Sequence, residues 1–87
     1  MFDLNGKRAL VTGASGGIGG AIAKALHTQG ATVALSGTRE DALKGLAGEL
    51  GERAHVTPAN LSSAEGAQKL IEDAEAAMGG VDILINN

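Results

Sequence analysis

The feature that most constrains this chain of 87 residues is a cluster of glycines placed directly after a short apolar run. The run at 8–12 is typical of a β-strand, and apolar residues at helical spacing follow the glycines from Ile18 onward. A turn from a strand into a helix directs backbone N–H groups and the positive end of the helix dipole at one place, which suits a phosphate group. Glycines there allow a tight turn and a close approach of the ligand. The segment 12–19 therefore predicts a phosphate-binding turn.

The spacing of these glycines distinguishes the turn from two widespread patterns. Neither G-x-G-x-x-G nor G-x-x-x-x-G-K-[ST] fits in any register. The pattern T-G-x-x-x-G-x-G does fit, through Gly13, Gly17 and Gly19, and T-G-x-x-G-x-x-G fits through Gly13, Gly16 and Gly19. The alternative is a glycine-rich turn chosen only because it is tight.

The rest of the chain alternates expected strands and helices. After the first strand we expect strands at 31–36, 54–57 and 81–85. The expected helices run from about Gly17 to Gly30, from Glu40 to Gly51, and from a cap at Ser62 or Ser63 to Gly79. Their predicted buried faces are Ile18, Ile22, Ala25 and Leu26; Leu43, Leu46, Ala47 and Leu50; and Leu70, Ile71, Ala74, Ala77 and Met78. This alternation predicts an α/β fold with a parallel sheet, and the continuous apolar run at 81–85 is typical of a strand buried on both faces.

Composition excludes several classes of function. The net charge is −3, the basic residues are scattered and Phe2 is the single aromatic residue, so nucleic-acid binding is not expected. The chain has no cysteine, and we interpret the acidic run at 72–75 as a solvated helix face, so no metal site is predicted. No apolar run reaches the roughly 18 residues that a membrane span needs. Residues 1–7 lack a signal-peptide pattern, and we expect a cytoplasmic protein without membrane contact.

The end of the second expected strand bears on which dinucleotide the turn would bind. NAD-binding units usually place an acidic residue about 20 positions after the glycines, where it bonds the ribose 2′-hydroxyl. This chain reads Leu-Ser-Gly-Thr-Arg at 35–39, with no acid before Arg39. A guanidinium can hold a 2′-phosphate through paired hydrogen bonds, which favours NADP(H) over NAD(H). The alternative is that Arg39 is a solvated charge paired with Glu40 or Asp41.

Polar residues also follow the two later strands. Asn60 and Leu61 lie where the chain could contact an adenine ring, although an ordinary turn before a helix fits equally well. Asn86 and Asn87 come directly after the fourth strand. Ligands bind at the carboxyl ends of strands in such sheets, so these amides are well placed, but they could also only cap a turn.

Together these segments resemble the short-chain dehydrogenase/reductase family. The resemblance rests on 12–19, on Asn60-Leu61 and on 81–87, which ends like the start of the family's N-N-A-G motif. It implies the N-terminal part of a Rossmann fold, with about four parallel strands in the order 3-2-1-4 and helices on both faces. Residues 1–87 would form one partial NAD(P)-binding domain, truncated before the catalytic half.

The resemblance also implies roles for individual residues. The residues that would hold the pyrophosphate and the adenosine ribose are Gly13, Ala14, Ser15, Gly16, Gly17, Ile18 and Gly19. Thr38 and Arg39 would meet the 2′-phosphate, Asn60 and Leu61 the adenine, and Asn86 the ribose on the nicotinamide side. The family often has a basic residue at the position of Gly16 and an aspartate at that of Asn60.

Within the family, the segments 2–7, 31–33 and 36–39 are similar to bacterial 3-oxoacyl-[acyl-carrier-protein] reductases, which use NADPH in fatty-acid biosynthesis. The full-length enzyme would take an acyl-carrier-protein thioester and form a tetramer. The family's catalytic Ser, Tyr and Lys would lie beyond residue 87, and this chain has no tyrosine, so we expect these residues alone to be inactive. An open apolar edge with Val81, Ile83 and Ile85 would favour a homodimer or strand exchange. The alternative is a non-catalytic nucleotide-binding or self-assembling module complete at this length.

Overall fold

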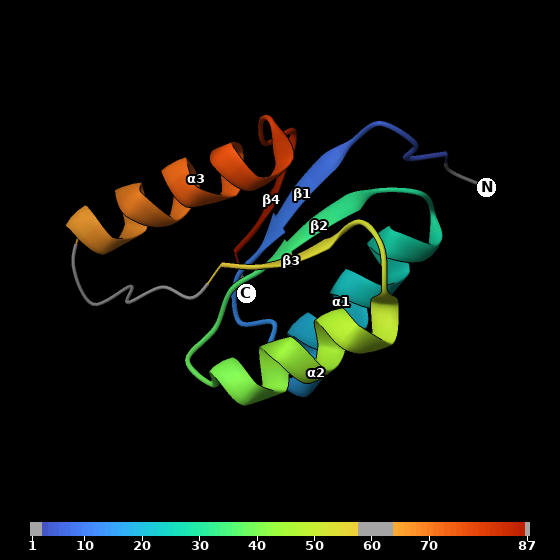
Figure 1. Ribbon diagram of the computed structural model, residues 1–87, viewed down its shortest axis with the longest axis horizontal. Coiled ribbons are helices and arrows are strands. Elements are labelled where there is room, and N and C mark those ends of the chain that lie inside the picture. The colour runs from blue at the N-terminus through green and yellow to red at the C-terminus, as the bar shows by residue number, and fades with distance from the viewer. Residues whose placement is uncertain (1–2, 58–63, 87) are drawn as a thin grey trace.

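The sheet at the centre of the molecule is parallel throughout (Figure 1). The computed structural model describes residues 3–57 and 64–86. Its strands are β1 (Arg8–Val11), β2 (Thr32–Leu35), β3 (Ala54–Val56) and β4 (Ile83–Ile85). They lie in the order β3-β2-β1-β4, which confirms the expected fold class and strand order. The expected caps at Ser62 and Ser63 lie outside the described residues.

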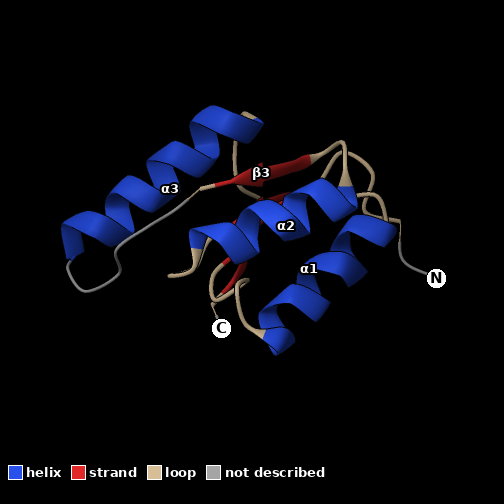
Figure 2. Ribbon diagram, turned by 60° about the horizontal axis from the view of Figure 1, so that its bottom comes forward, coloured by secondary structure: helices blue, strands red, loops and turns tan. Residues whose placement is uncertain are grey.

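Helices cover both faces of this sheet. They are α1 (Gly17–Thr28), α2 (Glu40–Leu50) and α3 (Ala64–Met78). In Figure 1, α3 lies above the sheet and α1 and α2 lie below it, and Figure 2 shows α1 and α2 side by side. Side chains alternate between the faces of a strand. Ala9, Val11, Val33 and Leu35 accordingly pack with α1 and α2, whereas Leu10 and Ala34 pack with α3.

The predicted buried face of α1 is right only in part. Leu26 packs against the core and Ile22 is half-buried. Ile18, however, is 73% exposed and Ala25 is exposed, whereas Gly19 and Ala23 are buried. Small residues on the buried face let the helix axis lie close to the sheet, and the larger residues beside them then remain on its flank. The predicted face of α2 is confirmed, because Leu43 and Leu46 are buried and Ala47 and Leu50 pack against the same core.

The predicted faces of α3 and β4 are right only in part. On α3, Leu70 and Ala74 are buried, but Ile71 is 41% exposed and Ala77 is exposed. The expectation that β4 is buried on both faces is wrong, since Leu84 is 54% exposed. The reason is that α3 packs mainly on β2 and β1, so its flank toward β4 stays open. Val81, Ile83 and Ile85, the residues expected at an open edge, are half-buried.

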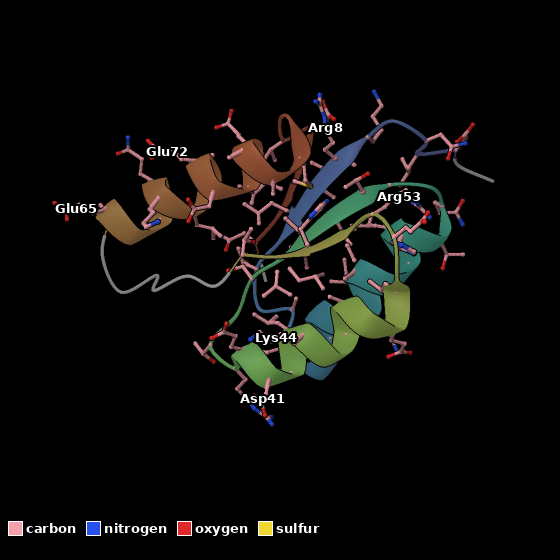
Figure 3. The ribbon with its side chains drawn as sticks, in the orientation of Figure 1. Arg8, Asp41, Lys44, Arg53, Glu65 and Glu72 are labelled. Atoms are coloured by element: carbon pink, nitrogen blue, oxygen red, sulfur yellow. The ribbon has the colours of Figure 1, made fainter. Side chains whose placement is uncertain are left out.

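An ion pair fastens the amino end of β4 to β1. Arg8 donates from Nε to Oδ2 of Asp82 over 3.0 Å and from Nη1 to the carbonyl of Gly79 over 2.9 Å. The backbone N–H of Arg8 donates to the same Oδ2, and the N–H of Asp82 donates to the carbonyl of Arg8. Hydrogen bonds from the Arg8 side chain, and then from its backbone, lower the pKa of Asp82. Figure 3 shows Arg8 at the end of the sheet where β1 begins.

Long apolar helices are missing from the part of the chain that the structure describes. None of its helices has the length and hydropathy needed to cross a membrane.

Candidate phosphate-binding turn

The glycine-rich segment forms the connection between β1 and α1. Gly13 has φ +65°, a left-handed conformation that glycine adopts without steric cost. The N–H of Gly16 donates to the carbonyl of Gly13 over 3.1 Å, which closes the turn. The N–H of Ala14 donates to the carbonyl of Ser36 over 2.8 Å and ties the turn to the end of β2. The turn is therefore fixed on both sides at the carboxyl edge of the sheet.

The first turn of α1 presents backbone donors that the helix itself does not use. The first helical hydrogen bond runs from the N–H of Gly20 to the carbonyl of Gly16. The N–H groups of Gly17, Ile18 and Gly19 consequently have no acceptor within the helix. Gly16 caps the helix without a side-chain hydrogen bond, and the first turn has no acidic residue. These donors and the helix dipole together suit a phosphate group.

The space in front of these donors is open. A β carbon built on Gly17 would meet no heavy atom within 4 Å. A hollow of about 340 Å³ adjoins the same turn and continues between α1 and α2, where Lys24 and Glu49 form an ion pair of 2.9 Å. The turn is thus accessible to a ligand without rearrangement of the backbone.

A row of hydroxyl groups lines the carboxyl edge of the sheet next to the turn. Thr12, Ser36 and Thr57 each follow the last residue of a strand, and they are 5%, 1% and 5% exposed. They are the buried polar residues of the described chain. The pairing of Val11 with Leu35, and of Leu35 with Val56, puts the three residues side by side. Oγ of Ser36 has no hydrogen-bond partner in the part of the molecule that the structure describes.

The hydroxyl groups of this row were not predicted as a site. The expected strands at 8–12, 31–36 and 54–57 end at Thr12, Ser36 and Thr57, so the residue types at the strand ends were visible in the sequence. Their alignment side by side was not, because it depends on the register of the three strands.

Asn86 is brought to the same edge. Oγ1 of Thr12 lies 3.1 Å from the carbonyl oxygen of Ile85 and 3.4 Å from Oδ1 of Asn86. Asn86 and Thr12 also line a hollow of about 250 Å³ between α3 and the sheet, with Leu84 and Ile71 on its apolar side. The structure therefore places Asn86 beside the glycine-rich turn, as its position in the sequence predicts.

Thr38 and Arg39 lie exposed between β2 and α2. Arg39 stands at the N-cap of α2, where its carbonyl accepts the N–H of Leu43 over 3.1 Å. The alternative in which Arg39 pairs with Glu40 or Asp41 is not what the structure has: within residues 3–57 and 64–86, Glu40 pairs with Lys44 and Arg39 has no ion pair. The guanidinium is available to a ligand at this edge.

The remaining candidate residues divide into two groups. Asn60, Leu61 and Asn87 lie outside the described residues, so their expected roles stay predictions. In the acidic run at 72–75 on α3, Glu72 is exposed and points away from the sheet (Figure 3). No group of three histidine, aspartate or glutamate side chains that could hold a metal ion occurs in the described parts of the chain.

Comparison with known proteins identifies the family. A family model described as short chain dehydrogenase matches residues 7–87, which include the whole glycine-rich turn. The chain belongs to the short-chain dehydrogenase family. The resemblance seen in the sequence is thereby confirmed.

Individual members of the short-chain dehydrogenase family are similar to the chain over all or nearly all of its length. It is 59% identical to Nodulation protein G of Rhizobium sp. (strain N33) and 44% identical to the 3-oxoacyl-[acyl-carrier-protein] reductase FabG of Rickettsia bellii (strain RML369-C), over 87 residues each. Both matches cover 100% of this chain, which spans only 36% of the first protein and 34% of the second. A crystal structure of 3-ketoacyl-(acyl-carrier-protein) reductase from Brucella melitensis, complexed with NADH, matches with a TM-score of 0.89 and 35% identity. That match covers 94% of this chain and 34% of the other.

Proposed function

We propose that these residues form the cofactor-binding part of a nicotinamide-dependent oxidoreductase, with 1–87 as one partial dinucleotide-binding domain. The observation that carries the proposal is the row of N–H groups at Gly17, Ile18 and Gly19, which have no acceptor within α1 and lie at the carboxyl edge of a parallel sheet. A pyrophosphate placed there would accept these hydrogen bonds and face the helix dipole. The turn from Gly13 to Gly19, with Ala14 and Ser15, would line the pyrophosphate and the adenosine ribose.

We propose NADP(H) as the cofactor, with NAD(H) as the competitor. Arg39 is exposed and has no ion pair among the described residues, and Thr38, which precedes it, is also exposed. Both groups donate hydrogen bonds, which a 2′-phosphate accepts more strongly than a 2′-hydroxyl does because it is charged. The similar reductase from Brucella melitensis was solved with NADH, so the two cofactors must be compared directly.

The proposed substrate of the whole protein is a 3-oxoacyl thioester carried on acyl-carrier protein. Support comes from the names of two similar proteins, both reductases of this substrate class. When bound, NADPH would supply a hydride to the C3 carbonyl carbon of the substrate, and a proton taken up by the carbonyl oxygen would complete the 3-hydroxyacyl product. The chain has no tyrosine that could donate this proton in the way the family does. We therefore propose that these 87 residues bind the dinucleotide and reduce nothing by themselves.

We also propose that the isolated polypeptide associates with a second copy along the flank of β4 and α3. Leu84 and Ile71 are 54% and 41% exposed there, and β4 pairs only with β1 among the described strands. An exposed strand edge with apolar neighbours promotes pairing between chains. Analytical ultracentrifugation is expected to show a dimer that Leu84→Lys dissociates. A monomer before the substitution would contradict this assembly.

Isothermal titration of the polypeptide with NADPH and NADH tests the proposed function. Binding of both, with NADPH the tighter, is the expected result. No heat with either nucleotide at millimolar concentration would contradict dinucleotide binding, and tighter NADH binding would contradict the cofactor preference. Oxidation of NADPH with an acetoacetyl thioester by this polypeptide would contradict its proposed inactivity.

A further inference from the structure

Gly37 lies against Ser15 where the segment after β2 passes the glycine-rich turn. A β carbon built on Gly37 would be 2.6 Å from Oγ of Ser15 and 3.1 Å from both its Cβ and its backbone N. The first of these distances is shorter than carbon and oxygen atoms tolerate without a bond, and the other two are tight. The φ angle of Gly37 is not in the left-handed region, so glycine is needed here for space and not for backbone conformation.

The two segments cannot separate freely to make room. The residues just before this contact are joined, because the N–H of Ala14 donates to the carbonyl of Ser36 over 2.8 Å. Ser36 is itself held to β1 by a bond from its N–H to the carbonyl of Val11 and is only 1% exposed. A larger residue at position 37 would therefore act first on the side chain that is free to rotate, which is the Ser15 hydroxymethyl group.

We propose that Gly37 is a positioning residue for recognition of the 2′-phosphate, an inference that rests on the proposed function. The missing side chain lets Oγ of Ser15 lie against the segment that continues into Thr38 and Arg39. In this proposal, two hydroxyl groups and one guanidinium from the connections after β1 and β2 would bind the same phosphate. All three donate hydrogen bonds, and donors that meet a charged acceptor bind more strongly than donors that meet a neutral one.

The geometry separates this role from binding of the pyrophosphate. The donors proposed for the pyrophosphate are the N–H groups of Gly17, Ile18 and Gly19, and none of these residues is among the three nearest contacts of position 37. Gly37→Ala is expected to turn the Ser15 hydroxyl away while leaving those amides in place. NADPH affinity is then expected to fall about tenfold, the size of one hydrogen bond to a charged group, and NADH affinity less than about twofold.

A double-mutant cycle tests the inference, with dissociation constants of NADPH and NADH measured by titration for each variant of the chain. Gly37→Ala and Ser15→Ala are each expected to lower the NADPH-to-NADH preference about tenfold. The double variant is expected to match Ser15→Ala, because no hydroxyl remains to be displaced, so the two effects do not add. Gly48→Ala, whose β carbon would meet no atom within 4 Å, is the control and is expected to keep the preference unchanged.

Other outcomes overturn the inference. Equal loss of NADPH and NADH binding in Gly37→Ala would make Gly37 only a structural residue, and additive effects in the double variant would separate it from Ser15. If Gly37→Ala shows no cooperative unfolding in a thermal melt, the test depends on Ser15→Ala alone. An unchanged NADPH-to-NADH preference in Ser15→Ala would then overturn the proposal. Absence of any dinucleotide binding by the unsubstituted chain overturns the proposed function as well, whereas binding with an unchanged preference in both single variants overturns this inference alone.

Discussion

Thr12 donates a hydrogen bond from Oγ1 to the backbone carbonyl of Ile85 over 3.1 Å, which joins the first residue of the glycine-rich turn to the last residue of β4. The backbone N–H of Thr12 donates to the same carbonyl over 3.0 Å. At the other end of β4, Asp82 is bonded to Arg8. A strand of three residues is therefore held to β1 at both ends, and Asn86 is held at the edge where the candidate site lies.

Thr12→Val tests the first of these attachments. Valine has nearly the same shape but no hydroxyl, so the free energy of unfolding is expected to fall by about 1 kcal/mol, the net value of one such bond. In a chain of this size that lowers the melting temperature by about 4–8 °C. Thr12→Ser keeps the hydroxyl and should melt closer to the original chain. Equal melting of the valine variant and the original chain would show that this bond does not stabilise the fold.

Gly17→Ala separates binding from folding. The added methyl group would have no heavy atom within 4 Å, so it causes no steric clash and the melting temperature is not expected to fall. If the pyrophosphate lies against Gly17 as proposed, the methyl group takes part of the space that it needs, and we expect NADPH affinity to drop by at least about tenfold, one lost hydrogen bond to a charged group.

Gly45→Ala is the matched control for Gly17→Ala. Its β carbon also meets no atom within 4 Å, but it lies exposed in the middle of α2. This substitution is expected to stabilise the chain by about 0.5–1 kcal/mol, because alanine restricts the unfolded chain more than glycine does, and to leave affinity unchanged. Undiminished NADPH binding by a folded Gly17→Ala variant would place the phosphate elsewhere.

Gly16→Arg is expected to improve NADPH binding. Gly16 has φ −91° and ψ 165°, an extended conformation open to any residue, and its β carbon would lie in ordinary contact 3.5 Å from the carbonyl of Gly13. A guanidinium at this position can add a charge-assisted bond to the 2′-phosphate, so NADPH affinity should rise about tenfold and NADH affinity little. Gly16→Gln controls for size and polarity. An equal gain with glutamine, or a larger gain for NADH, would contradict a phosphate contact here.

Asp82→Asn tests the Arg8 ion pair through its dependence on pH. The folded-state pKa of Asp82 is lowered by Arg8, so its carboxylate is more acidic in the folded chain than in the unfolded one, where the pKa is about 3.9. The resulting stability is present above about pH 4 and is lost as the pH falls through the lowered folded-state pKa. Melting temperatures of the two chains are therefore expected to differ at neutral pH and to converge in acid. A difference that stays constant down to pH 2 would exclude a contribution from the carboxylate charge.

The order of elements and the place of the site could be predicted because local patterns carry them. Apolar runs with glycines between them mark the ends of strands, and the turn from Thr12 to Gly19 could be located without coordinates. The exposure of Ile18 and Ile71 could not be predicted from the sequence. Helical spacing indicates a broad apolar stripe, but it does not show how much of that stripe contacts the sheet. Gly19 and Ala23 occupy that contact because their size allows close packing.

Contacts between distant residues were also beyond the sequence. Gly37 and Ser15 stand 22 positions apart, and their close approach depends on how the connections after β1 and β2 cross at the edge of the sheet. The hydroxyl row formed by Thr12, Ser36 and Thr57 depends on a register that is set by packing across three strands. Local patterns place a residue on an element, while such neighbours are placed by the whole fold.

Binding of a pyrophosphate by the backbone amides of the turn can be measured one residue at a time from amide chemical shifts of the ¹⁵N-labelled polypeptide. On addition of saturating NADPH, we expect the largest shifts at the N–H groups of Gly17, Ile18 and Gly19, and small shifts along α3. Amide signals of this turn that stay in place while NADPH binds, or while no binding occurs at all, would contradict it.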